Sequence, residues 1–148
     1  MMLVAVLMCC TQCDPLKKVE AQAYPINYTE LDNYYVLNTV DANKLRKVII
    51  DNEQDFRQYF GEAAVMGRKG QPTPVNFKTQ YVLAVILPTT DRLTQVIPAE
   101  ISQVNNTVVF NYRVKKGEKQ SHTMTPFAAV AIDKPKNTEQ FEFYFKQL

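Results

Sequence analysis

The sequence has no cysteine after residue 13 and a single histidine, His122, among its 148 residues. Thiol catalysis is therefore excluded from the main part of the chain. A disulfide framework is excluded as well, because it would spread cysteines along the domain. A zinc site would need more Cys or His ligands at suitable spacing than the sequence provides. We expect neither a metal nor another cofactor.

Serine is almost as scarce, with only Ser102 and Ser121 in the chain. Ser121 precedes His122, but neighbouring residues of a strand point to opposite faces, so these two cannot pair locally. No G-x-S-x-G motif is present. Helix capping and a solvated strand face explain the carboxylate pairs, so glycosidase-type chemistry has no support in the sequence. We therefore expect a protein that is not an enzyme.

Neither sign of charge dominates, because 17 basic residues oppose 15 acidic residues and leave a net charge of +2. The longest basic runs are pairs such as Lys115-Lys116, so no stripe of cations lies beside exposed aromatic residues. We therefore expect no nucleic-acid partner. The length and the 46% hydrophobic content suit one globular domain with its own core.

The N-terminal segment MMLVAVLMCC, residues 1–10, is an uninterrupted hydrophobic run. It is too short to span a bilayer, which takes about 20 residues, but it suits the hydrophobic region of a signal peptide, typically about 7–15 residues. The basic residues that usually precede such a region are absent, which a start site further upstream would explain. A buried N-terminal strand or helix is the alternative interpretation.

All three cysteines lie where this run ends, at Cys9, Cys10 and Cys13. Leu7-Met8-Cys9-Cys10 resembles a bacterial lipobox with Cys10 as the acylated residue, although a small residue is usual at the position of Cys9. Cys9 and Cys13 are alternative sites. Each buried methylene of an acyl chain contributes about 0.8 kcal/mol to membrane binding. We expect an exported protein, lipid-anchored at the bacterial cell envelope and facing the periplasm or the exterior.

On this interpretation, the chain has three parts: a lipoprotein-type signal segment at residues 1–10, a tether and a folded domain. Residues 11–32 carry two prolines and mixed charge without a steady period, which predicts a tether. Residues 33–148 form a single β-rich domain. One helix is indicated by Asp51 as N-cap, by Gln54 three residues later, and by an apolar stripe that we expect to pack on a sheet. The stripe consists of Phe56, Tyr59, Phe60 and Ala63.

Strand patterns occupy the rest of the domain. Residues 81–87 are continuously apolar, as expected for a central strand covered on both faces. Pro98 indicates an edge or a bulge, Asn105-Asn106 a short turn, and residues 115–120, KKGEKQ, a polar hairpin loop with Gly117 at positive φ. We predict a mainly β, α+β domain: a small antiparallel β-sandwich or barrel-like sheet of about six to eight strands, with one early helix packed on it. The expected strands are 34–37, 45–50, 81–87, 97–101, 108–114, 127–132 and 141–145.

Several short motifs resemble the C-terminal domain of PrcB-like proteins, over residues 45–146. They are Val48-Ile49-Ile50 before the helix, Asn76-Phe77-Lys78 leading into Tyr81-Val82-Leu83-Ala84-Val85, Pro88-Thr89-Thr90, and Thr125-Pro126-Phe127. The family loop usually reads Pro-Thr-Gly-Gly-Tyr, whereas this chain continues with Thr90, Asp91, Arg92 and Leu93, a departure at the loop contacts. The resemblance implies an exported, non-catalytic domain, in a family named for a protein that stabilises a bacterial surface protease complex.

A looser likeness is to chagasin-type inhibitors of papain-like proteases, which are β-sandwiches that present three loops from one end. The chain has Pro88-Thr89-Thr90, Gly117 and Thr125-Pro126-Phe127 in the same order as those loops. The Asn, the Gly-Tyr and the Trp of the inhibitor loops are missing. Stiff, proline-anchored loops lose little entropy on binding, and Phe127 would supply an aromatic anchor.

We predict that the domain binds a protein partner, with a secreted protease or its complex as a candidate. The alternatives are a loop-wedge protease inhibitor and a structural envelope module with no defined ligand. The prediction requires the two proline-bearing bends to lie at the same end of the domain. The predicted binding residues are Pro88, Thr89, Thr90, Asp91, Arg92, Gly117, Thr125, Pro126 and Phe127.

Overall fold

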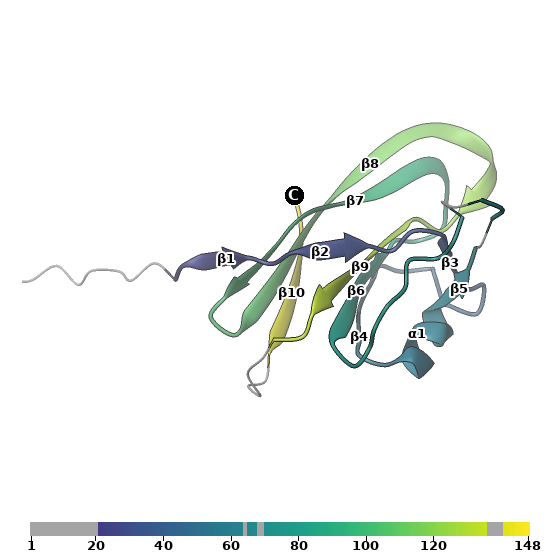
Figure 1. The fold of residues 1–148 in the computed structure, drawn as a ribbon. Helices are drawn as coiled ribbons and strands as arrows, with labels where there is room; N and C mark the ends of the chain where they lie inside the picture. Colours follow the sequence, from purple (N-terminus) through teal and green to yellow (C-terminus); the bar gives the residue numbers. More distant parts are fainter. Residues whose placement is uncertain (1–20, 64, 68–69, 136–140) are drawn as a thin grey trace, which may run out of the picture.

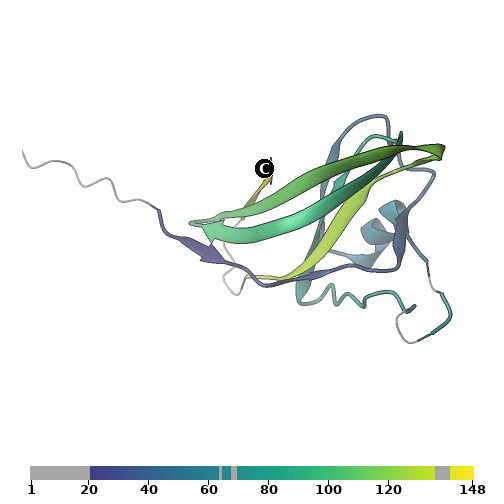
Figure 2. The ribbon, with the colours of Figure 1, turned by 90° about the horizontal axis from the view of Figure 1, so that it is seen from above.

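The computed structural model describes residues 21–63, 65–67, 70–135 and 141–148. The predicted signal segment, its Cys10 and residues 11–20 of the predicted tether lie outside these ranges. Ten strands and one short helix occur within them, which confirms a mainly β, sandwich-like domain (Figure 1, Figure 2). No helix in the described ranges is long and apolar enough to cross a membrane.

Two four-stranded sheets form the sandwich, and a two-stranded sheet lies at one end. The strand orders are β1-β7-β8-β10, β2-β9-β6-β4 and β3-β5. The elements are β1 (Ala23–Pro25), β2 (Tyr28–Glu30), β3 (Tyr34–Val36), β4 (Arg46–Ile50), α1 (Glu53–Tyr59), β5 (Phe60–Glu62), β6 (Gln80–Ile86), β7 (Thr90–Val104), β8 (Thr107–Met124), β9 (Phe127–Asp133) and β10 (Glu142–Gln147).

Strand β6 is central and covered on both faces, as its apolar run predicted. It pairs with β4 on one side and β9 on the other. Leu83 and Val85 pack in the core between the two large sheets, whereas Val82, Ala84 and Ile86 pack in a second core on the helix side. A continuous apolar run is needed because alternate residues enter different cores.

Helix α1 begins one residue later than predicted. Asn52, not Asp51, is the N-cap, and its side-chain oxygen accepts the N–H of Asp55 at 2.8 Å. Phe56 is buried, and its ring centroid lies 5.2 Å from that of Tyr34 in an edge-to-face contact, so this residue of the predicted stripe packs inward as expected. The prediction that Phe60 and Ala63 continue the stripe on the helix is wrong, because both lie beyond its last residue, Tyr59. The helix ends before Phe60, whose extended backbone begins β5.

The tether prediction is wrong for residues 23–31. Strand β1 pairs with β7 and β2 pairs with β9, and the N–H of Ile26 donates to the oxygen of Ile101 at 2.7 Å. Leu31 is buried in the core on the helix side. Strands of three residues are too short to show a period in the sequence, so composition alone suggested a tether.

Strand β10 runs parallel to β8, so the sandwich is not wholly antiparallel. The pairing extends from Glu142 opposite Thr107 to Gln147 opposite Tyr112, and the N–H of Leu148 then donates to the Tyr112 oxygen at 2.8 Å. Because β9 lies between these strands in sequence, no tight turn forces them antiparallel.

Strands β7 and β8 form a long hairpin that arches away from β6 and β9 before returning to them (Figure 1). Asn105, at φ 53°, and Asn106 form its turn, as predicted. The pairing register shifts between Pro98 and Glu100, which confirms a bulge beside this proline. We refer to residues 90–98 of β7 and 113–124 of β8 as the ribbon.

The predicted hairpin loop at residues 115–120 is wrong, because this segment lies inside β8. Lys115 and Lys116 pair with Gln95 and Thr94 of β7. Gly117 does not adopt a positive φ. A Cβ at this position would lie 3.2 Å from the backbone oxygen of Leu93, so glycine permits close approach of the two strands. The polar run reflects a solvated strand rather than a turn.

Candidate functional site

The two proline segments meet where a pair of strands passes from one sheet to the other. Leu87-Pro88-Thr89 connects β6 to β7, and Thr125-Pro126 connects β8 to β9. The Leu87 N–H donates to the Pro126 oxygen at 2.8 Å, and the Thr89 and Thr125 hydroxyls lie 2.9 Å apart. We call residues 87–89 and 125–126 the proline corner. Both bends therefore lie at one end of the domain, as the prediction required.

Proline suits both positions for a structural reason. A proline has no N–H to donate to a ladder, so it fits where strand pairing is interrupted. Pairing stops at Ile86 opposite Phe127 and resumes at Thr90 opposite Met124. The corner consequently has a role in the fold, whatever else it does.

The corner forms one wall of a hollow of about 640 Å³, whose opposite wall is segment 35–43. The N–H of Thr89 donates to the oxygen of Ala42 at 2.9 Å and ties the two walls together. Segment 35–43 is not among the residues that the sequence predicted to bind. Its turn-forming residues Asp41 and Asn43 were the available signal.

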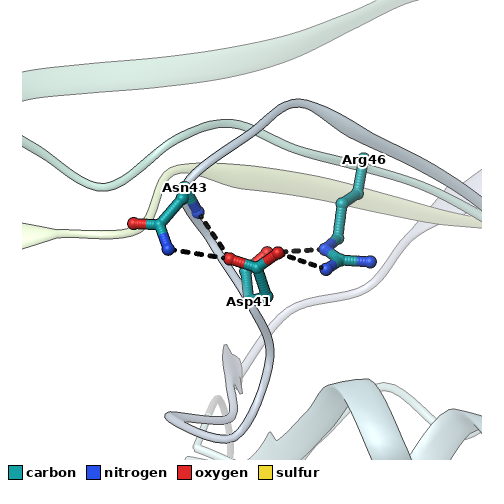
Figure 3. A network of polar contacts seen from close by, with 3 residues as sticks. All are labelled: Asp41, Asn43 and Arg46. Atoms are coloured by element: carbon teal, nitrogen blue, oxygen red, sulfur yellow. Dashed lines mark hydrogen bonds and ion pairs between the residues drawn. The ribbon is translucent and has the colours of Figure 1, made fainter.

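Asp41 organises the segment that faces the corner (Figure 3). One carboxylate oxygen accepts the backbone N–H and the side-chain amide of Asn43, at 3.3 and 2.9 Å. The other oxygen lies 3.0 Å from a guanidinium nitrogen of Arg46. The Asn43 N–H, the Asn43 amide and the charges of Arg46 and Lys44 lower the pKa of the Asp41 carboxyl. This carboxylate is therefore held charged and engaged within its own loop.

Two further hollows share the corner as a wall. One, of about 350 Å³, lies between the corner and residues 94–98 of β7. The other, of about 340 Å³, lies between the corner, Val114 and Lys116 of β8, and Gln147 of β10. Three hollows therefore share residues of the corner as part of their lining.

The structure separates the predicted binding residues into several groups. Within the corner, Pro88 and Thr89 are exposed, whereas Pro126 is buried. Phe127 is half-buried, with its ring centroid 5.3 Å from that of Phe60, so most of this aromatic surface serves the core. Gly117 lies within the ribbon and not on a loop.

Asp91 and Arg92 lie at the start of the ribbon, beyond the corner. The Asp91 carboxylate forms an ion pair with Lys119 at 3.2 Å, and Arg92 is paired opposite the same lysine. The Arg92 N–H also donates to the Thr90 hydroxyl at 3.2 Å. These residues reinforce the entry into β7 and belong to the edge of the candidate site.

Two tyrosines away from the corner have a raised pKa. Burial, and then the charge of Glu62, raise the pKa of Tyr34, whose hydroxyl donates to the Thr73 oxygen at 2.8 Å. Burial raises the pKa of Tyr112. His122 is exposed on β8. The chemistry that the corner itself offers is hydrogen bonding through hydroxyls and packing against prolines.

Comparison with protein-family models, with curated proteins and with solved structures found no match for this chain. The likeness to PrcB-like and chagasin-type proteins rests on the short motifs quoted above and stays a prediction.

Proposed function

We propose that this domain is a non-catalytic module that binds a protein partner through the proline corner and the hollows beside it. The corner itself carries the proposal. Two segments separated by 36 residues are joined there by the contact between Thr89 and Thr125, and Pro88 and Thr89 remain exposed. A surface fixed in advance loses little entropy on binding.

The proposed partner is another envelope protein, with a secreted protease or its complex as the first candidate. The support for this choice is the set of PrcB-like motifs, two of which form the corner. The same proposal includes export and acylation of Cys10. Metabolic labelling with a palmitate analogue should mark the wild-type protein and not Cys10→Ser, and labelling that persists would move the site to Cys9 or Cys13.

A loop-wedge protease inhibitor is less well supported by the geometry. Such a wedge needs three loops at one end, but the third predicted loop, residues 115–120, is part of β8. Pro126 is buried and Phe127 packs against Phe60, so neither is free to fill a protease cleft. The corner is better suited to contact a partner's surface than to enter its active site.

Site-specific photo-crosslinking in the source cells tests the proposal. A photoreactive residue at Thr89 should give an adduct with one partner protein. Thr79 is the matched control, because it is also an exposed threonine and lies just before the other end of β6. No adduct from position 89, or the same adducts from both positions, would contradict the proposed function and favour a structural module.

A further inference from the structure

Beyond its pairing with β10, one edge of strand β8 is unpaired in the part of the chain that the structure describes. β10 pairs with β8 only as far as Tyr112, and no other described segment pairs with this side of β8 beyond that residue. The adjoining stretch of β8 is regular, because its pairing with β7 keeps one register from Tyr112 to Lys116. An unpaired, regular edge is a template on which another strand can form.

The direction of the backbone groups on this edge follows from one observed bond. The Leu148 N–H donates to the Tyr112 oxygen, so the backbone groups of Tyr112 point toward β10. Residues two apart in a regular strand direct their N–H and C=O groups to the same side. Val114 and Lys116 therefore present their backbone groups to the open edge, whereas Arg113 and Lys115 direct theirs toward β7.

The side chains along this edge carry unpaired positive charge. Arg113, Lys115 and Lys116 are exposed cations that form no ion pair with any described residue, in contrast to Lys119, which contacts Asp91. Lysines on an edge strand oppose the pairing of two identical copies, because like charges would then face one another. The same charges favour a strand that carries carboxylates.

A hollow lies directly beside the free edge. Val114, Lys116 and Gln147 line one side of the 340 Å³ hollow, and corner residues including Thr89 and Pro126 line the other. A strand added next to β8 would direct alternate side chains over this hollow, close to Lys116. Its remaining side chains would lie beside Arg113 and Lys115.

We propose that the edge of β8 at residues 113–116 binds an extended, acidic segment of the partner. This segment would form backbone hydrogen bonds to β8 and so become an added strand of the sheet. This inference rests on the proposed function, since it states the chemistry of the partner beside the proline corner. Backbone hydrogen bonds supply the affinity, and carboxylates facing the cations supply the selectivity.

A synthetic peptide of alternating glutamate and valine tests the inference against the full-length protein. We expect binding by fluorescence anisotropy, and no binding of the same peptide with lysine in place of glutamate. A version N-methylated at each residue keeps the charge but loses every N–H, so a strand-addition mode predicts that its binding is lost. Equal binding of the N-methylated version would overturn the proposal, as would no binding of the acidic peptide.

Two charge-reversal variants locate the site. Lys116→Glu should weaken binding by about tenfold, whereas Lys78→Glu makes the same charge change at an exposed position before β6 and should not. Equal affinities would overturn the proposal. If Lys116→Glu fails to fold, the N-methylated peptide still decides the question on the wild-type protein.

The remaining outcomes separate this inference from the proposed function. Wild-type protein that binds vesicles of anionic phospholipid but not the peptide would assign the cations to a membrane surface and overturn the strand proposal. An adduct at Thr89 without peptide binding would support the corner as the binding site and overturn the proposal for the β8 edge. Peptide binding without an adduct at Thr89 would support strand addition at the β8 edge and overturn the proposal that the corner binds the partner.

Discussion

Strands β7 and β8 run from the sandwich body into the ribbon, and the burial of their side chains differs between these two regions. Strand β8 shows the change within one element: Val108, Phe110 and Tyr112 are buried in the core, whereas no residue from 113 to 124 is buried. On the β7 side of the ribbon, only Thr94 and Val96 are buried. Whether a side chain of β8 is buried therefore depends on the layer packed against that part of the strand, and not on the strand itself.

The polar groups of the two regions differ in the same way. In the body, the Lys134 ammonium donates to the Phe77 oxygen at 2.6 Å and lies 4.9 Å from the centre of the Tyr81 ring. In the ribbon, the ammonium groups of Lys115 and Lys116 form no ion pair with any described residue. We infer that the body supplies stability and the ribbon supplies chemistry for binding.

The largest expected difference is between two apolar truncations. Phe110 is fully buried, with its ring centroid 5.7 Å from that of Phe145, so Phe110→Ala should lower the free energy of unfolding by about 3–5 kcal/mol. Leu93 lies in the ribbon and is 48% exposed, so Leu93→Ala should cost roughly 1 kcal/mol or less. Urea denaturation measures both values, and similar losses would show that the ribbon is as tightly packed as the body.

A second comparison concerns lysines. Lys134→Met removes charge-assisted hydrogen bonds to backbone oxygens and should cost about 1.5–3 kcal/mol of unfolding free energy. Lys116→Met removes no such bond and should change this quantity by no more than about 0.5 kcal/mol. Equal effects in denaturation experiments would contradict the distinction between engaged and free cations.

The decrease in the free energy of unfolding at alkaline pH should also come from a residue of the body. Burial raises the pKa of Tyr112, so the folded state keeps this proton to higher pH than the unfolded state does. The free energy of unfolding should therefore be level below the pKa of an unfolded tyrosine, about 10, and should fall as the pH rises through the folded pKa. Tyr112→Phe should reduce that fall, and an unchanged pH profile would count against the effect.

The smallest effect is expected for the ion pair of the ribbon. The Asp91 and Lys119 side chains are substantially exposed, at 46% and 73%, so their pair is screened by solvent and salt. Lys119→Ala should change the free energy of unfolding by about 0.5 kcal/mol or less, and added salt should remove the difference. A larger, salt-independent loss would mean that the ribbon depends on this contact.

The sequence predicted the elements whose patterns are long or strongly periodic. The apolar run of β6, the alternation of Val108, Phe110 and Tyr112, and the Asn105-Asn106 turn are confirmed. Strands β1 and β2 were missed because three residues cannot show a period. The parallel pairing of β10 depends on contacts between strands distant in sequence, which a local pattern does not contain.

The candidate site was predicted in part. The proline segments were correctly placed at one end. Because β6 pairs with β9 and β7 pairs with β8, the β6–β7 and β8–β9 connections lie side by side. Gly117 was misplaced because a solvated strand and a turn share the same polar composition. The unpaired edge of β8 could not be inferred from the sequence, since it depends on how far the pairing with β10 extends along β8.

Amide hydrogen exchange in the free protein tests the central claim most directly, residue by residue along β8. We expect slow exchange at Phe110, and beyond Tyr112 an alternation: fast exchange at Val114 and Lys116, whose N–H groups face the open edge, and slower exchange at Arg113 and Lys115, which are bonded to β7. Equal protection at all four ribbon positions would show that this edge is already covered and would contradict the account.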